Sequence, residues 1–342
     1  RFMGISTGAS IVVSQHFGAR DRDRLSRTVG VTVWLTLLSG GLMMVVGAAA
    51  AKPLLMLLDT PAEMLDLAND YLFIIMLGMP FLTMYNILSG VLRGMGDSVS
   101  PLVYLLVASL LNIVLDLAFV TLLGMTTDGV ALATVIAQSV SAFLGLNKLR
   151  RMKKTLDFGW HTLRMDREIA SRIVRLGLPA GMTQMIFSLS SILVQSLTNS
   201  LGPSVVTAGT AVMRVDGFAM MPNFTFGIAM ATFAGQNIGA NRLDRVVEGT
   251  KAGMWMGVGV SVLLTLMILL FGEWLMRMFT STEQVVDLGV RMMRILAVGY
   301  ITMGVTQILS GVMRGAGDTM TPMWISIITT VIIRMPIAYG LE

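Results

Sequence analysis

Long apolar runs are the feature of this sequence that most restricts its fold. A helix of about 20 mostly apolar residues crosses the hydrocarbon core of a bilayer, and stretches of that kind follow one another through all 342 residues. They predict an all-α polytopic membrane protein. We expect a partial span at 1–18 and full spans at 28–51, 68–92, 101–123, 128–148, 172–200, 205–235, 247–272, 288–313 and 320–341.

Composition argues against several other classes of protein. Hydrophobic residues make up 54% of the chain and charged residues 13%, about half the charge of a soluble domain. No stretch alternates in the manner of barrel strands, which argues against a β-barrel. Cysteine is absent, and the two histidines, His16 and His161, are predicted in polar loops. This removes most of the chemistry of a membrane enzyme, so we expect no enzymatic activity and no cofactor.

The net charge of +5 indicates membrane topology rather than nucleic-acid binding. Most of the 25 Lys and Arg residues lie in every second loop, and such loops are cytoplasmic in membrane proteins. The longest of these loops, 149–171, follows directly on Lys148 and begins with basic residues. We interpret it as a topology signal and a linker, with contact to anionic lipid as the alternative.

An internal repeat divides the chain. The segment Leu88–Pro101 matches Leu309–Pro322 at nine of fourteen positions with an offset of 221 residues, and the same offset aligns Gln15 with Gln236. Because both copies are predicted on the cytoplasmic side, the halves have the same orientation. The repeat therefore predicts two parallel six-helix bundles from a twelve-span parent, of which about nine and a half spans are present and both ends are cut.

The repeat also predicts the domain organisation. Residues 1–148 form an N-terminal lobe with spans two to six of the parent, 149–171 a cytoplasmic linker, and 172–342 a C-terminal lobe with spans seven to eleven. Two parallel lobes suit alternating access, with a substrate cavity between them. A channel or an enzyme requires no such duplication.

The repeated segment contains a loop motif, Arg-Gly-x-Gly-Asp. Its glycines are expected to end the preceding helix and to permit a left-handed turn, while its aspartate caps the next helix or pairs with the arginine. A turn that fixes helix pairing and a cytoplasmic hinge or gate are both open interpretations. The residues concerned are Arg93, Gly94, Gly96 and Asp97, and Arg314, Gly315, Gly317 and Asp318. A second pair, Gln15–Ala19 and Gln236–Ala240, is interpreted as a helix C-cap or a close helix approach.

Polar residues inside a span are expensive and are functional candidates. Asn112 and Asp116 are four residues apart in an apolar span and share one face. Thr134, on the next span, is predicted to meet Asp116 at equal depth. The three side chains supply hard oxygen ligands for Na⁺, and the carboxylate alone can carry a proton. A neutral aspartate held by Asn112 for packing is the structural alternative.

The second half has no equivalent acid, since the offset of 221 places isoleucines there. Its intramembrane polar residues and a methionine-rich helix are candidates for a substrate cavity or a gate, and pairing between helices for stability is the alternative. These candidates are Arg214, Asp216, Gln184, Asn223, Arg334 and Met213.

These motifs together resemble the multidrug and toxic compound extrusion (MATE) family of prokaryotic exporters, over essentially the whole chain. The resemblance rests on Leu88–Pro101 and its copy, on Gly235–Ala240, on Asn112–Asp116 and on Gly129–Thr134. It implies twelve helices in two lobes, and export of mostly cationic, amphipathic compounds driven by Na⁺ or H⁺.

The resemblance also implies roles for particular residues. Several members bind a cation in the N-terminal lobe with an acid on the first helix, an Asn-x-x-x-Asp pair and a threonine. The pair maps onto Asn112 and Asp116 and the threonine onto Thr134, while the first-helix acid would lie outside this chain. Other members use acids in the second lobe, and the span 288–313 has none.

The predicted function is therefore antiport across the plasma membrane of a prokaryote, in which a monomer exports small organic compounds in exchange for Na⁺ or H⁺. No metal site is expected beyond Na⁺ at Asp116. The alternative is a flippase for lipid-linked precursors with the same two-bundle design, which Arg214 and Arg334 keep open.

Overall fold

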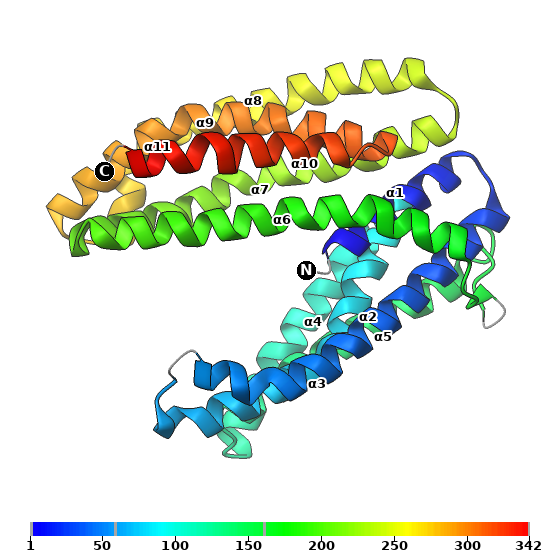
Figure 1. The fold of residues 1–342 in the computed structure, drawn as a ribbon, viewed down its shortest axis with the longest axis horizontal. Coiled ribbons are helices and arrows are strands. Elements are labelled where there is room, and N and C mark those ends of the chain that lie inside the picture. Colours follow the sequence, from blue (N-terminus) through cyan, green and yellow to red (C-terminus); the bar gives the residue numbers. More distant parts are fainter. Residues whose placement is uncertain (1–2, 58–59, 160–161, 341–342) are drawn as a thin grey trace. The chain divides into compact units, whose positions relative to one another are not determined.

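The computed structural model describes residues 3–57, 60–159 and 162–340, and shows the predicted all-helical architecture (Figure 1). Within these ranges no residue is in a strand. The helices are α1 (Met3–Gly18), α2 (Arg22–Leu57), α3 (Ala62–Gly94), α4 (Val99–Leu117), α5 (Thr127–Arg151), α6 (Arg167–Ser200), α7 (Pro203–Gly239), α8 (Leu243–Arg277), α9 (Glu283–Ala316), α10 (Met320–Ile327) and α11 (Met335–Gly340), with the π-helical turns η1 (Ala118–Leu122) and η3 (Ile328–Arg334).

Helices α2, α3 and α5 to α9 each contain one predicted span and extend beyond it. The span predicted at 101–123 corresponds to α4 and η1, and the described parts of the spans predicted at 1–18 and 320–341 correspond to α1 and to α10, η3 and α11. Eight helices of the described residues are long and apolar enough to cross a membrane. Helix α4 has the smallest buried share of the eight. Its Leu102, Leu106 and Leu110 side chains are all exposed. Helix α7 is not among the eight, since polar residues such as Asp216 and Asn223 interrupt its apolar sequence.

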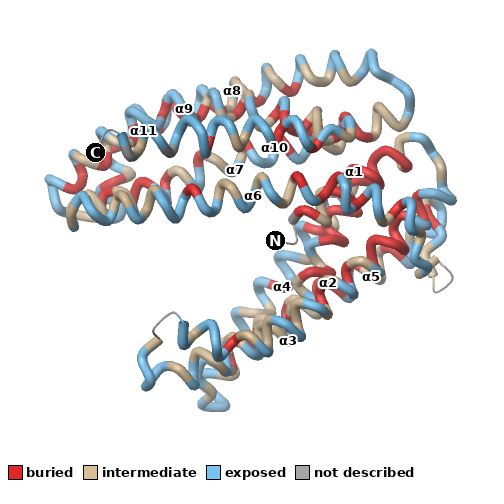
Figure 2. The backbone as a smooth tube through the Cα atoms, in the orientation of Figure 1, coloured by how far each residue is buried: buried red, intermediate tan, exposed pale blue. Residues whose placement is uncertain are grey.

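The chain folds as two compact units, residues 2–177 and 178–342. In the first, α3 packs against α1, α2 and α5, and its core includes Val29, Leu88, Val91 and Leu149. In the second, α7, α8 and α9 pack on one another around Tyr300 and Met293. Buried residues line the contacts between helices in both units, whereas outward faces are exposed and largely apolar (Figure 2).

Both copies of the repeat pack a Gly-x-x-x-Gly face against a neighbouring helix, as membrane helices commonly do. A Cβ atom at Gly90 would lie 2.7 Å from Ser6 Oγ on α1, and one at Gly94 would lie 2.9 Å from the Ser10 carbonyl oxygen. In the second unit, Cβ atoms at Gly311 and Gly315 would overlap backbone oxygens of α7. Gly94 and Gly315 therefore permit close helix packing, and Gly94 is also the last residue of α3, as expected.

The left-handed turns are formed by Gly96 and Gly317, whose φ angles are 88° and 95°. The Asp97 N–H donates to Leu92 O and the Asp318 N–H to Met313 O, both at 2.9 Å, which satisfies carbonyls that the helix end leaves free. This part of the prediction is confirmed.

The aspartates of the motif cap the following helices. Asp97 accepts hydrogen bonds from the Ser100 N–H and hydroxyl and pairs with Lys148 at 3.2 Å, and Asp318 accepts from the Thr321 N–H. Burial by itself would raise the pKa of Asp97, but the Ser100 hydrogen bonds and Lys148 lower it. Of the two predicted roles, capping is the one observed.

The second repeated element ends a helix in both units, as expected: α1 ends at Gly18, and α7 ends at Gly239 with Ala240 as its C-cap. A left-handed residue follows in each case. Arg20 and Asn241, again 221 residues apart, both have φ of 55°. His16 lies in the last turn of α1 rather than in a polar loop, with Nδ1 2.8 Å from Thr28 Oγ1. His161 lies outside the described residues.

The predicted linker packs on the first unit. Leu149 and Leu156 are fully buried in its core, the Asp157 N–H donates to Ser26 Oγ at 2.9 Å, and Trp34 Nε1 donates to Leu163 O at 2.6 Å. The first unit continues into α6, where Ile173 packs against α1. The units divide at 177/178, and the lobe border at 149–171 remains a prediction.

We expect Gly30→Ala to release this segment, because a Cβ atom at Gly30 would overlap the Thr162 carbonyl oxygen. Trypsin should then cleave after Arg164 about fivefold faster, since local opening controls cleavage. The matched control is Gly41→Ala on the same helix, where a Cβ atom meets no neighbour within 4 Å. Equal cleavage rates in the two variants would contradict the docking of the segment on α2.

Candidate functional site

Helices α4 and α5 hold a row of polar side chains within the first unit. The two helices are antiparallel neighbours joined by a short loop. Two contacts define their register: Ser141 Oγ donates to Tyr104 O at 3.0 Å, and Asn112 Nδ2 lies 3.5 Å from Thr134 Oγ1. The structure therefore brings Asn112 and Thr134 together.

Asp116 lies one helical turn beyond this pair, towards the loop between α4 and α5. In the antiparallel register Asp116 is level with Val130 rather than with Thr134. Thr134 was expected to lie at the depth of Asp116, and it contacts Asn112 instead. The carboxylate oxygen Oδ1 of Asp116 is buried and has no hydrogen-bond partner among the described residues. A buried acceptor without a donor is costly, so this oxygen is a candidate for binding a proton or a cation.

Gln138 was not predicted and belongs to the same face. It follows Thr134 by one helical turn, and its Oε1 is likewise buried without a partner in the described part of the chain. The sequence signal was present, because residues at i and i+4 share a helix face.

The oxygens of this face suit a monovalent cation better than a divalent metal ion. Asp116 supplies one carboxylate, and Asn112 and Thr134 supply neutral oxygens, which are ligands that hard cations prefer. No group of three or more His, Cys, Asp or Glu side chains gathers in the described residues. A proton at Asp116 is equally compatible with this geometry.

The candidates of the second unit do not form one cluster. Arg214 and Met213 are exposed on α7, and Arg214 Cζ lies 5.8 Å from the centre of the Phe279 ring. Asp216 turns to another side of the helix and accepts a hydrogen bond from the Tyr300 hydroxyl. Arg214 and Asp216 therefore face different neighbours, as their spacing of two residues predicts.

The other three candidates of the second unit, Asn223, Arg334 and Gln184, differ in how far they are buried and bonded. Asn223 is fully buried, and its amide accepts from Ser261 Oγ at 2.8 Å and donates to Tyr300 O at 3.1 Å. It is a buried, hydrogen-bonded residue of this unit, and its role in a cavity or gate stays a prediction. Arg334 Nη1 lies 3.3 Å from Ser190 Oγ, and Gln184 is exposed.

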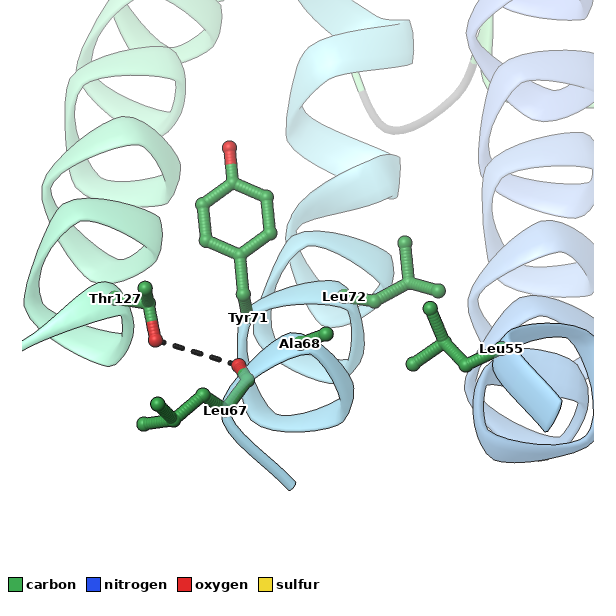
Figure 3. Close-up of a pocket in the computed structure, with 6 residues that line it drawn as sticks. All are labelled: Leu55, Leu67, Ala68, Tyr71, Leu72 and Thr127. Atoms are coloured by element: carbon green, nitrogen blue, oxygen red, sulfur yellow. Dashed lines mark hydrogen bonds between the residues drawn. The ribbon is translucent and has the colours of Figure 1, made fainter. Parts of the chain in front are cut away.

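An open apolar depression of about 440 Å³ lies at the end of the first unit where α5 begins (Figure 3). It is lined by Leu55 of α2, by Leu67, Ala68, Tyr71 and Leu72 of α3, and by Thr127 of α5. The Thr127 hydroxyl donates to Leu67 O at 3.3 Å and is thereby occupied. The depression presents no charged group and shares no residue with the polar face of α4 and α5.

Two helical units that repeat the same turns and the same helix contacts, with apolar surfaces long enough for a bilayer, define a multi-pass membrane transporter rather than an enzyme. The family model described as MatE matches residues 2–118 and 179–340. This chain belongs to that family, which confirms the resemblance found in the sequence.

Relatives agree with this assignment. The probable multidrug resistance protein YoeA of Bacillus subtilis (strain 168) is 32% identical over 99% of this chain and 75% of its own length. YpnP of the same organism, also described as a probable multidrug resistance protein, is 31% identical over 98% of this chain and 75% of its own length. A crystal structure of MATE in the bent conformation is similar in fold, with a TM-score of 0.93, 22% identity, and coverage of 99% of this chain and 75% of that one.

Proposed function

We propose that this protein exports organic, cationic and amphipathic compounds in antiport with Na⁺ or H⁺. The observation that carries the proposal is the buried Asp116 Oδ1, which has no partner among the described residues and lies one turn from the Asn112–Thr134 pair. The resemblance of the chain to proteins described as probable multidrug resistance proteins supports the substrate class.

The charge of Asp116 explains how an ion would drive transport. An ionised carboxylate inside a membrane span is costly, and a bound cation or proton removes that cost. Asp116 therefore has two states, one charged and one neutralised. The ion shifts the equilibrium between two packings of the protein only by the difference in its affinity for them. Binding from the outside would thus favour the arrangement in which substrate is released.

The proposal places the protein in the plasma membrane of a prokaryote, as a monomer with small-molecule substrates and no cofactor. The basic cytoplasmic loops support that orientation. No role is assigned to nucleic acid, since the basic residues gather where the membrane topology requires them.

Efflux under separately imposed gradients tests the proposal. Cells or proteoliposomes containing the protein are loaded with ethidium or norfloxacin, and Na⁺ and proton gradients are applied one at a time. We expect efflux under one gradient and its collapse when that gradient is dissipated. Well-inserted protein that moves neither compound under either gradient would contradict the proposal and favour a flippase for lipid-linked precursors.

A further inference from the structure

Two buried side-chain oxygens without partners in the described residues lie on the same pair of helices. They are Asp116 Oδ1 on α4 and Gln138 Oε1 on α5, and they flank the Asn112–Thr134 contact. The proposed function uses the first of them and leaves the second unexplained. A buried amide oxygen retains its full desolvation cost unless a donor or a cation reaches it.

Gln138 lies on a stretch of α5 that contacts both of its neighbours, since Val135 packs against Gly78 of α3. The residues one turn before and about one turn after it, Thr134 and Ser141, both contact α4. In the register that these contacts set, Gln138 lies opposite Ala108, a small residue that is 3% exposed. The alanine side chain supplies no hydrogen-bond donor to Gln138 Oε1 at that level.

Gln138 lies closer to the cytoplasmic end of α5 than the Asn112–Thr134 contact does. Helix α5 ends at Lys148, Arg150 and Arg151, the predicted cytoplasmic end. Gln138 follows Thr134 by four residues and is therefore about 6 Å closer to the cytoplasm. Asp116 follows Asn112 by four residues on α4 and is therefore about 6 Å further from the cytoplasm than Asn112. The two oxygens are thus too far apart to hold one ion together.

We propose that the Gln138 amide oxygen is a second, inner binding position for the coupling ion, which reaches it from Asp116 past Asn112 and Thr134 on its way to the cytoplasm. This inference rests on the proposed function. The ligand is Na⁺ or the water that carries a proton, because both approach an amide oxygen as a positive group.

Two substitutions separate an oxygen ligand from a packing role. Gln138→Met keeps the length of the side chain and removes the hard oxygen, whereas Gln138→Glu keeps an oxygen at the same reach. The matched control is Ser139→Ala, since Ser139 Oγ donates to Val135 O of its own helix and is already occupied. The four proteins are reconstituted, and initial efflux rates are measured under the Na⁺ gradient and under the proton gradient.

We expect Gln138→Met to slow ion-driven efflux about tenfold, as the loss of one interaction with a charged group does. Gln138→Glu should retain at least about a third of the wild-type rate, and Ser139→Ala should match wild type. The gradient that drives wild-type efflux identifies the ligand as Na⁺ or proton-carrying water. Binding of the driving ion, followed by its effect on the melting temperature in detergent, should change less than twofold in Gln138→Met because Asp116 is intact.

A wild-type rate in Gln138→Met, or equal losses in the Met and Glu variants, would overturn the inner binding position. The Asp116→Asn protein distinguishes this failure from failure of the proposed function. If Asp116→Asn abolishes ion-driven efflux and Gln138→Met does not slow it, only the inference about Gln138 is wrong. If Asp116→Asn leaves ion-driven efflux unchanged, Asp116 is not the coupling residue, and if the wild-type protein shows no efflux under either gradient, the proposed function itself is wrong.

Discussion

The Asp116→Asn protein is expected to keep its fold and to lose at least about a hundredfold of its ion-driven efflux rate. Asparagine has the shape of aspartate, so the packing of α4 against α5 is retained. It can neither carry a proton nor attract a cation by charge, so binding of the ion no longer changes the balance between the two packings of the protein. The measurement is the initial efflux rate under the gradient that drives the wild-type protein.

Asp128→Asn is the matched control for this experiment. Asp128 lies at the start of α5, where its exposed carboxylate accepts a hydrogen bond from the Thr126 N–H at 2.9 Å, a contact that an asparagine oxygen retains. It should transport at a rate close to wild type. Equal rates in Asp116→Asn and wild type, with equal amounts of protein in the membrane, would exclude Asp116 as the coupling residue.

Gly311→Ala is expected to destabilise the second unit by about 3 kcal/mol, as overpacking of a tight contact does. Its Cβ atom would overlap the backbone carbonyl oxygen of Gly227 on α7, and backbone cannot rotate away. At the equivalent position Gly90, the nearest atom is the Ser6 hydroxyl at 2.7 Å. This side chain can change rotamer, so Gly90→Ala should cost only about 1 kcal/mol.

Gly299→Ala provides a control of opposite sign. Gly299 lies on α9 like Gly311, but a Cβ atom there meets no neighbour within 4 Å. Alanine should stabilise this helix by up to about 1 kcal/mol, because it restricts the unfolded chain and favours helix. Thermal unfolding in detergent, followed by tryptophan fluorescence, measures all three variants. Equal melting temperatures for Gly311→Ala and Gly299→Ala would show that the α7–α9 contact is not close packed.

Much of the fold follows from local sequence rules. The length and position of each helix depend on an apolar run and on the polar residues at its two ends. These features are visible in the linear sequence. The left-handed turns at Gly96 and Gly317 were predicted because few other residues tolerate that conformation. The equivalent turns at Arg20 and Asn241 were missed, since neither residue is glycine and the repeat alone does not say which position bends.

The candidate site was predicted in part. Asn112, Asp116 and Thr134 were identified as polar residues in apolar spans, and the shared face of Asn112 and Asp116 follows from helix periodicity. Their pairing was not predictable, because the axial offset between two helices depends on which small side chains meet. A shift of one turn decides whether Thr134 meets Asp116 or Asn112. Gln138 was overlooked for the same reason.

Apolar length and repeated motifs are properties of the chain alone, so they were sufficient to predict an all-helical membrane protein that is built from a repeat and related to exporters. Which polar residues find hydrogen-bond partners depends on how the helices pack. Asn223 is a core residue because Ser261 and Tyr300, from two other helices, take both ends of its amide. Asp116 and Gln138 remain candidates for ion binding because packing buries one oxygen of each without bringing a partner from the described residues. Hydrogen bonds between helices depend on rotation and register, which only the packed structure sets.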